Sequence, residues 1–478
     1  MTAYQNLRDY EFHNFSNELE DLDRQHPHVV RREIETIFRD EFALNIIMEE
    51  FPAIYEQELE GWARSFYNLE GHMQAILAYA TPDTHHTVLN LDKYHQAIQS
   101  VQNELNSLPN ARAFDVLTEL DLIKYEHTSA AGYDYIGSKG PINGDNHIRA
   151  IHRAKATLWS AIKDTDQGIS YVIENSVPDV GYTRTQLTDL TQKTKVRGVW
   201  GRAFHYILLE GTSARPLLDN FVAGNTFFHI GEDPLTSVPR VLSQVSGQCK
   251  WLYALDWSSF DSSVSRFEIY AAFDLLKERI SFPNYETEQT YELCKQLFIH
   301  KKIAAPNGKT YWSHKGIPSG SHFTSIIGSV INRLRVEYLW RLKFGRGPKM
   351  CYTQGDDSLI GDEELFSPEE MSTLVAPLGW TINANKTEYS TSPEFVTFLG
   401  RTTRGGMNTR ELMRCLRLLV FPEYPVESGK ISSYRARAIA EDCGGLSEII
   451  NLTARRLRKL YGIADIDDVP SHFVRYVP

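Results

Sequence analysis

Two short apolar runs in this chain end at carboxylates. In residues 350–360, apolar positions flank a polar turn on both sides, which is typical of a β-hairpin with the tripeptide 355–357, Gly-Asp-Asp, at its tip. The apolar run 251–255 stops at Asp256, as a buried strand does when it delivers a residue to a site at its end. The pattern therefore predicts a hairpin and a strand that each present acidic side chains.

Other stretches have helical periodicity. A helix is predicted over residues 262–276, directly after Asp261, and another over residues 94–108. The first 110 residues are predicted to be helical, because apolar residues recur there with helical spacing in an acidic background. These residues are Val30, Ile34, Ile37, Phe38 and Phe42. Asn307-Gly308, between apolar residues, predicts a second hairpin.

The two acidic segments indicate a metal-dependent site. Adjacent carboxylates at Asp356 and Asp357 repel each other, so a nearby divalent cation would stabilise them. Asp256 and Asp356 together could hold two Mg²⁺ ions, a pair suited to in-line phosphoryl transfer. Taken singly, each segment has an ordinary alternative, which is a surface turn for Asp356-Asp357 and a helix N-cap for Asp256.

Between these segments lies a polar loop that leads into a predicted helix. Ser319 and Gly320 give the loop a hydroxyl and free backbone amides. Thr324 and Asn332 are eight residues apart and share one helical face, so each could hydrogen-bond a ribose. The alternative is an ordinary loop and N-cap.

The three segments in this order resemble the palm motifs of a viral RNA-dependent RNA polymerase. Residues 256–261 resemble motif A, Ser319-Gly320 through Asn332 resemble motif B, and residues 355–357 resemble motif C. The amino-acid sequences of these motifs are most similar to those of the partitiviruses, which have segmented double-stranded RNA genomes. Positive-strand virus polymerases carry asparagine four residues after the motif B threonine, whereas this chain has Gly328 there and Asn332 later.

Further segments resemble the accessory motifs of the same family. Residues 193–202, with Lys195 and Arg197, resemble motif F, although partitiviruses usually have proline where Gly198 stands. Three other segments resemble motif G, which lines the path of the incoming template, motif D and motif E, which lies beside the primer strand. They are residues 128–133, the position of Lys386, and residues 398–401.

The resemblance implies an α+β, right-hand polymerase with fingers, an antiparallel-sheet palm and a helical thumb. The implied boundaries are a helical N-terminal extension at 1–115, fingers at 116–250 and 276–315, palm at 251–275 and 316–411, and thumb at 412–478. Such an extension bridges fingers and thumb in the family. A competing interpretation is an acidic helix that binds a partner.

The resemblance also implies the reaction and the role of each residue. The nascent 3′-OH attacks the α-phosphate of an NTP on an RNA template and releases pyrophosphate. Asp256 and Asp356 would hold two Mg²⁺ ions, with Mn²⁺ able to substitute, and Asp357 would support them. Asp261, with Ser319, Thr324 or Asn332, would sense the ribose 2′-OH. Three basic residues would act on the phosphates: Lys195 and Arg197 by neutralising the triphosphate, and Lys386 as a general acid.

One feature of the composition, the net charge of −11, is unusual for an enzyme that binds RNA. Residues 1–70 carry 16 Asp and Glu against 6 Lys and Arg, whereas 45 acidic and 44 basic residues share the rest. An acidic exterior around a basic tunnel is expected. Basic residues for it lie around Arg149, Arg153 and Lys155, at 193–202, at Lys301-Lys302 and at 455–459, unless these runs are solvated helix faces.

The expected partners are template and product RNA, NTPs and, from the resemblance, a viral capsid protein, in a virion interior within the host cytoplasm. No apolar run of about 18 residues predicts a membrane span. Three rival interpretations are a reverse transcriptase, a two-metal nuclease or phosphatase, and a non-enzymatic nucleic-acid-binding or capsid protein. Reverse transcriptases usually carry an aromatic residue where Asp261 stands, and the non-enzymatic interpretation cannot explain three motifs in order.

Overall fold

An antiparallel four-stranded sheet carries both acidic segments. The computed structural model describes residues 17–28, 38–64, 67–163, 168–184, 186–192 and 196–474. The strands of this sheet, in spatial order, are β11 (Met350–Gln354), β12 (Asp357–Asp362), β7 (Trp251–Ala254) and β13 (Glu388–Ser390). The predicted hairpin is confirmed, since β11 and β12 pair from Met350↔Gly361 to Gln354↔Asp357.

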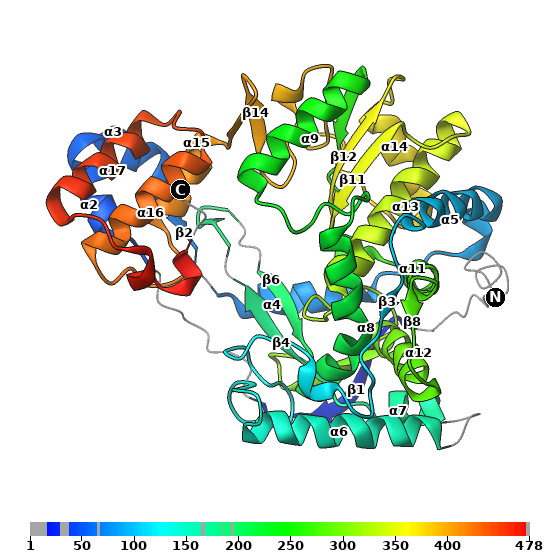
Figure 1. Ribbon diagram of the computed structural model, residues 1–478. Helices are drawn as coiled ribbons and strands as arrows, with labels where there is room; N and C mark the ends of the chain where they lie inside the picture. The colour runs from blue at the N-terminus through cyan, green and yellow to red at the C-terminus, as the bar shows by residue number, and fades with distance from the viewer. Residues whose placement is uncertain are drawn as a thin grey trace.

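A five-stranded sheet lies below this one in Figure 1. In spatial order its strands are β1 (Leu19–Gln25), β10 (Lys309–Ser313), β9 (Lys301–Ala304), β4 (Asp179–Arg184) and β6 (Arg197–Gly201). The predicted hairpin at Asn307-Gly308 is confirmed as the turn between β9 and β10. Three further pairs are β2 (Trp62–Ala63) with β5 (Thr188–Asp189), β3 (Ala111–Arg112) with β8 (Ile280–Ser281), and β14 (Thr402–Arg404) with β15 (Met407–Thr409).

Helices surround both sheets. Those before residue 250 are α2 (Glu41–Glu50), α3 (Pro52–Ile54), α4 (Leu69–Leu77), α5 (Leu91–Leu105), α6 (Asp145–Ile162), α7 (Gly168–Glu174), α8 (Phe204–Ala223) and α9 (Pro234–Gln248). Those after it are α10 (Phe260–Ser263), α11 (Arg266–Lys277), α12 (Tyr285–Ile299), α13 (Thr324–Phe344), α14 (Pro368–Val375), α15 (Leu412–Val420), α16 (Gly429–Asp442) and α17 (Glu448–Tyr461). The predicted helix at 94–108 corresponds to α5.

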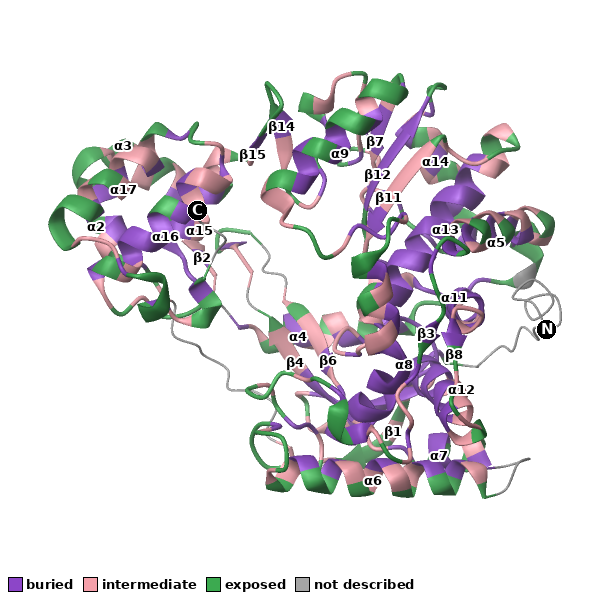
Figure 2. Ribbon diagram, viewed as in Figure 1, coloured by how far each residue is buried: buried purple, intermediate pink, exposed green. Residues whose placement is uncertain are grey.

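Helix α13 packs against the sheet that carries both acidic segments. Residues 326–340 of this helix are all buried, including polar residues such as Asn332 and Arg335, and Figure 2 shows the helix in the buried colour along most of its length. A helix that is buried on all sides is surrounded by protein rather than covering one face of it. It therefore fixes the elements around it, which include the hairpin.

The predicted helix 262–276 is divided into α10 and α11. Ser265 begins α11 with a capping box, in which Glu268 accepts a hydrogen bond from the backbone N–H of Ser265 at 2.8 Å. The sequence Ser-x-x-Glu is a known start signal, so this break was readable in the sequence.

The prediction of a wholly helical N-terminal extension is wrong at β1. Leu19–Gln25 pairs antiparallel with β10, from Leu19↔Ser313 to Gln25↔Lys309. The partner strand lies almost 300 residues away in sequence, so local periodicity does not reveal it. Of the predicted apolar stripe, Phe42 lies at the start of α2, whereas Val30, Ile34 and Ile37 fall outside the described residues.

The same extension contacts the lobe formed by α15, α16 and α17, at the left of Figure 1. Ala43, Leu44, Ile46 and Ile47 of α2 form one apolar core with residues of these three helices. Because β1 joins the five-stranded sheet and α2 joins this lobe, the segment bridges two parts of the molecule.

Candidate active site

The Gly355 turn is held by helix α13. Gly355 has φ +59°, in the left-handed region that favours glycine. Its N–H donates to Ser329 Oγ at 2.8 Å, and Thr353 Oγ1 donates to the Ser329 carbonyl at 2.9 Å. The turn that presents Asp356 and Asp357 is therefore held in place by α13. Both residues are accessible to solvent, although the surrounding protein partly desolvates their carboxylates.

Asp256 lies just beyond β7, next to the hairpin. Strand β12 pairs with β7 at Ile360↔Tyr253, which brings the two acidic segments to one edge of the sheet. The backbone of Asp256 is bonded on both sides: its carbonyl accepts from Asn383 N at 2.9 Å, and its N–H donates to Thr387 Oγ1 at 3.1 Å. The helix-cap alternative is wrong, because α10 begins at Phe260 with Ser259 as its N-cap.

Burial and neighbouring carboxylates raise the pKa of three of these acids. Partial burial and the charges of Asp356 and Asp256 raise the pKa of Asp357 to about 6. Burial and the charge of Asp356 raise the pKa of Asp261 to about 6, and burial, with a smaller contribution from Asp256, raises that of Asp356. The guanidinium of Arg197 opposes the rise in the pKa of all three. The four acids thus share one site with excess negative charge.

This excess charge fits a divalent cation. In the part of the chain that the structure describes, no three His, Cys, Asp or Glu side chains are grouped so as to hold a metal ion by themselves. Mg²⁺ usually binds through one or two carboxylates and takes its other ligands from water and substrate phosphates. Asp256 and Asp356, on adjacent strands with mutually unfavourable charges, match that kind of open site.

Asn332 does not face a ribose in this structure. Its Nδ2 donates to the carbonyls of Gly355 and Asp357, each at 3.0 Å, and its Oδ1 accepts from Trp257 Nε1 at 2.9 Å. The side chain is fully buried. Its amide therefore ties motif A to motif C, and the prediction that it senses the 2′-OH is corrected to a positioning role.

The loop that precedes α13 rests on strand β6. Ser319 Oγ accepts from the N–H of Trp200 at 3.2 Å, and a Cβ at Gly320 would lie only 2.1 Å from the Trp200 carbonyl. Glycine is needed there because the two backbones are in close contact. Thr324 Oγ1 donates to the Pro318 carbonyl at 2.8 Å, so its proton is used within the loop while its oxygen can still accept.

Of the predicted basic residues, Arg197 faces the acids. It is exposed on β6, and its positive charge opposes the rise in the pKa of Asp261, Asp356 and Asp357. Lys195 lies outside the described residues. The prediction that Lys301 and Lys302 line an RNA tunnel is wrong, because both are buried in β9 and donate to backbone carbonyls.

Lys386 lies on an exposed turn beside Asp256. Its backbone N–H donates to the Asn383 carbonyl at 3.2 Å, in the same turn whose Asn383 and Thr387 bond the backbone of Asp256. The structure thus places the residue at the edge of the site and leaves its proposed chemistry a prediction.

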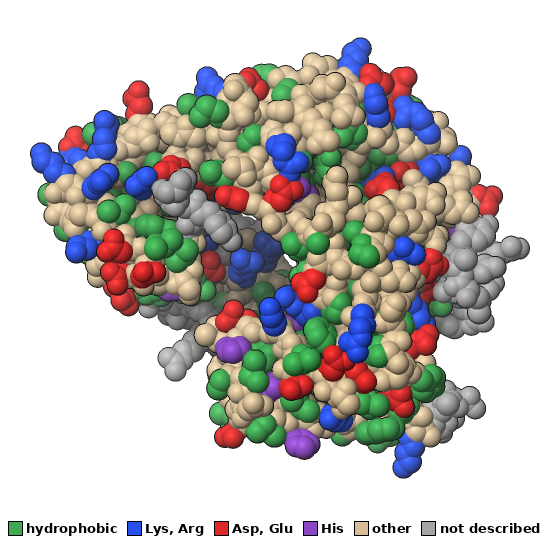
Figure 3. All heavy atoms as spheres, viewed as in Figure 1, with side chains coloured by type: hydrophobic (Ala, Val, Ile, Leu, Met, Phe, Trp, Pro, Cys, Tyr) green, Lys and Arg blue, Asp and Glu red, His purple; other side chains and the backbone are tan. Residues whose placement is uncertain are grey.

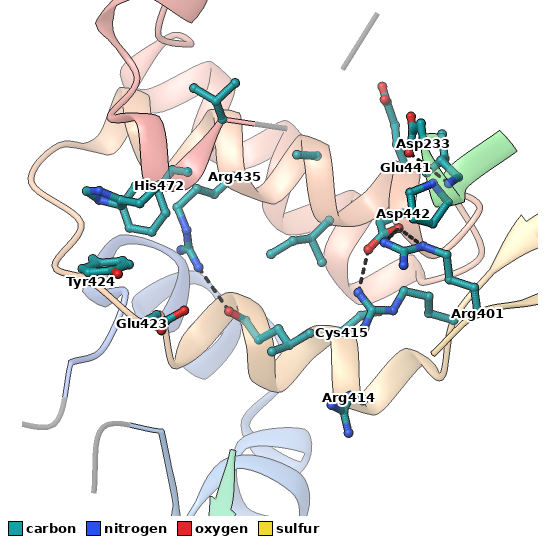
Figure 4. A pocket seen from close by; sticks show the side chains of 18 of the residues that line it. Asp233, Arg401, Arg414, Cys415, Glu423, Tyr424, Arg435, Glu441, Asp442 and His472 are labelled. Atoms are coloured by element: carbon teal, nitrogen blue, oxygen red, sulfur yellow. Dashed lines mark hydrogen bonds and ion pairs between the residues drawn. The ribbon is translucent and has the colours of Figure 1, made fainter. Parts of the chain in front are cut away.

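The segments that resemble motifs G and E lie in two other parts of the molecule. Tyr135, just after residues 128–133, lies under Arg149 and Arg153, at 5.3 and 4.9 Å from its ring centroid. At the other place, Arg401 binds Asp442 of α16 at 2.8 Å. Figure 4 shows this pair at one end of a cavity of about 500 Å³ between residues 401–415 and the lobe of α15 and α16. The acids of the site do not line this cavity.

A buried ion pair below motif A was missed in the sequence. Arg335 of α13 binds both oxygens of Glu268, at 2.6 and 2.9 Å. Its guanidinium lies 5.1 Å from Trp257, 5.0 Å from Phe260 and 4.6 Å from Trp380, measured to the ring centroids. The capping sequence signalled Glu268, but nothing in the sequence signalled its partner 67 residues later.

The molecule has a hollow that opens on one face. Figure 3 shows it between the lobe of α15–α17 and the rest of the molecule, with Lys and Arg side chains inside.

Among the described residues, no helix is both long and apolar enough to cross a membrane.

Comparison with known proteins agrees with this geometry. A family model described as "Viral RNA-dependent RNA polymerase" matches residues 38–458. The chain is 30% identical over 156 residues to the RNA-directed RNA polymerase of Cryptosporidium parvum virus 1, a match that covers 30% of this chain and 29% of the relative. It is 32% identical over 114 residues to the genome polyprotein of a human hepatitis A virus, covering 22% of this chain and 5% of the polyprotein. The matches thus span less than a third of these curated relatives.

A solved structure shares the fold. The RNA-dependent RNA polymerase of a human picobirnavirus superposes with a TM-score of 0.66 at 16% identity, over 91% of this chain and 87% of that one. A deletion mutant of the same enzyme gives a TM-score of 0.63. At this identity the likeness shows a shared mixed α/β fold.

Proposed function

The chain belongs to the family of viral RNA-dependent RNA polymerases, and from that premise we propose that it copies an RNA template by adding nucleotides to a growing RNA 3′ end. The observation that carries the proposal is the convergence of Asp256, Asp261, Asp356 and Asp357 opposite Arg197. Clustered acids with excess negative charge beside an exposed guanidinium suit a substrate with a triphosphate and a divalent cation.

Members of the family generally use a divalent metal. In our proposal Asp256 and Asp356 hold two Mg²⁺ ions, replaceable by Mn²⁺, and Asp357 supports them. The bound ions supply activation of the 3′-OH and stabilisation of the charge that develops on the phosphates. The protein's own contribution is to hold Asp356 and Asp357 on a hairpin braced by Ser329 and Asn332, with Asp256 beside it at the end of β7.

The remaining residues orient the nucleotide. Arg197 neutralises the triphosphate, and Lys195 is proposed to assist it. Asp261 accepts a hydrogen bond from the ribose 2′-OH, with Ser319, Gly320 and Thr324 forming the wall of the ribose site. Lys386 donates a proton to the leaving pyrophosphate, a role open to an exposed ammonium on the turn beside Asp256.

We further propose that the genome copied is double-stranded RNA and that the chain is most similar to partitivirus polymerases. The support is the position of the motif B asparagine at 332 with Gly328 before it. A Cβ at Gly328 would lie 3.8 Å from the Cα of Gly355 and 3.8 Å from Phe260, so this position faces the junction of motifs A and C. A capsid protein as partner, and the virion interior within the host cytoplasm as location, follow from this proposal.

The direct test is RNA synthesis in vitro. The full chain is incubated with a defined single-stranded RNA, Mg²⁺ and labelled NTPs, with Asp356→Asn as the matched control. Template-length product from the wild type alone is expected. Degraded template without product would favour the rival two-metal nuclease. Efficient use of dNTPs in place of NTPs would favour the reverse transcriptase.

A further inference from the structure

The base of the loop before α13 is firmly anchored. Ile317 N donates to the Asp261 carbonyl at 2.8 Å, and Tyr79 OH donates to the Ile317 carbonyl at 2.6 Å. The buried ammonium of Lys301 donates to the carbonyl of Lys315 at 2.6 Å. Strand β9, motif A and the segment after α4 thus hold the start of the loop in place.

The tip of the loop, residues 319–322, rests on helix α8. Ser321 Oγ donates to the carboxylate of Glu210 and accepts from the N–H of Phe323 at 3.1 Å. The ring of His322 covers the next residue of α8, because a Cβ at Gly211 would lie 3.2 Å from His322 Nδ1. The Ser321 hydroxyl and the backbone of His322 therefore both link the tip to one buried carboxylate.

Glu210 is a buried acid at an internal junction. Its exposed fraction is 2%, and its nearest opposite charge is Arg202, which also lies 3.7 Å from Asp179 and donates to the Leu297 carbonyl at 2.8 Å. Burial raises the pKa of Glu210 to about 7, while Arg202, Ser321 and the backbone of His322 oppose the rise. A buried carboxylate is retained at a cost in stability unless it is well bonded, and its bonds here lead to the loop.

We propose that Glu210 is a positioning residue for nucleotide binding, whose carboxylate holds the loop tip in the arrangement that receives the incoming nucleotide. The tip is well placed for such a role, because it also contacts β6 through Ser319 and Gly320, and β6 carries Arg197. Releasing the tip from α8 would move the ribose wall relative to the triphosphate-binding strand. The inference rests on the proposed role of this loop in nucleotide binding.

The test compares Glu210→Ala, Glu210→Gln and Ser321→Ala in steady-state synthesis. Glu210→Ala and Ser321→Ala are each expected to raise the KM for NTP roughly ten- to a hundredfold with kcat changed about threefold at most. The double variant should have a KM close to that of Glu210→Ala, because Glu210→Ala already removes the acceptor of the Ser321 hydroxyl. Glu210→Gln keeps an acceptor for Ser321 and should restore a KM within about threefold of the wild type.

A matched control separates positioning from stability. Asp362 is an equally buried acid at the far end of β12, bonded to Arg346 at 2.9 Å, and Asp362→Asn should lower the melting temperature with KM unchanged. If Glu210→Ala behaves like this control, the proposal is overturned. If Glu210→Ala does not fold, Ser321→Ala, which leaves the carboxylate in place, is compared with the control instead. The proposal is then overturned if Ser321→Ala lowers the melting temperature with KM unchanged. Absence of product from the wild type would instead overturn the proposed function.

Discussion

At the scale of single residues, the acids at the sheet edge have separable tasks. Asp356→Asn should abolish synthesis and leave the fold and RNA binding nearly intact, since a metal-binding carboxylate stabilises the transition state more than the folded protein. We expect a loss of at least roughly a thousandfold in rate, equivalent to about 4 kcal/mol of barrier. The measurement is labelled-NTP incorporation alongside thermal unfolding. Substantial activity with Mg²⁺ would exclude the assigned role.

Asp261 should govern sugar choice. Asp261→Ala is expected to relax discrimination between NTP and dNTP more than it lowers turnover, because one hydrogen-bond partner of the 2′-OH is lost. The effect should be about 1–3 kcal/mol. Competing incorporation of the two nucleotide types on one template measures it. An unchanged ratio would transfer the sensing role to Ser319 or Thr324, since Asn332 is already bonded within the protein.

Glu210 should make stability depend on pH. Because burial raises its pKa from 4.5 to about 7, the folded protein keeps a proton that the unfolded chain has lost between these values. Its contribution is therefore fully present below pH 4.5 and is lost as the pH rises through about 7. Denaturant unfolding at several pH values should show a steeper fall for the wild type than for Glu210→Gln. Parallel curves would contradict the shift.

At the scale of elements, helix α13 joins the three palm motifs. Asn332→Ala should lower the free energy of unfolding by about 2–5 kcal/mol, because it leaves buried Trp257 Nε1 without an acceptor and two carbonyls without donors. It should also lower kcat, since the hairpin loses a brace. Urea unfolding and synthesis assays on the same preparation check both effects. Asn332→Asp keeps the acceptor for Trp257 but sets a buried carboxylate oxygen against the two carbonyls, so it should be at least as destabilising as Asn332→Ala. A clearly milder effect would argue against the bonding described.

At the scale of the whole molecule, the N-terminal segment is part of the closed structure. Deleting residues 1–70 should expose apolar surface and cut both solubility and processive synthesis, because α2 supplies part of the core shared with α15–α17 and β1 completes the five-stranded sheet. RNA binding should become less specific and more sensitive to salt as acidic residues are lost. Gel filtration, processivity assays and RNA binding at two salt concentrations measure these effects.

A point variant refines that prediction. Asp40, which caps α2, accepts from Arg435 Nη1 at 2.6 Å and from Ser432 Oγ at 2.8 Å, and its side chain is fully buried. Asp40→Ala should loosen the segment and speed proteolysis near it, whereas replacing the exposed Glu41 should not. If a protease removes the segment readily from the wild type and the rest polymerises normally, the segment instead serves another partner.

The chemistry of the site and its local elements were determined by the sequence alone. The hairpin at 350–360, the strand that ends before Asp256 and the helix at 94–108 follow from apolar spacing and turn residues, which act over a few residues. The motif order also predicted the candidate site, because the chemistry of paired acids depends on few neighbouring residues.

Only the tertiary structure decided which polar residues face substrate and which face protein. Asn332, Lys301 and Lys302 have the residue types of a substrate site, yet their hydrogen bonds go to carbonyls brought close by folding. Glu210 meets Ser321 across 111 residues of sequence, and β1 meets β10 across nearly 300. Such contacts depend on the packing of distant segments. Leaving a buried polar group unpaired costs free energy, and this cost favours one set of contacts over another only once the core has formed.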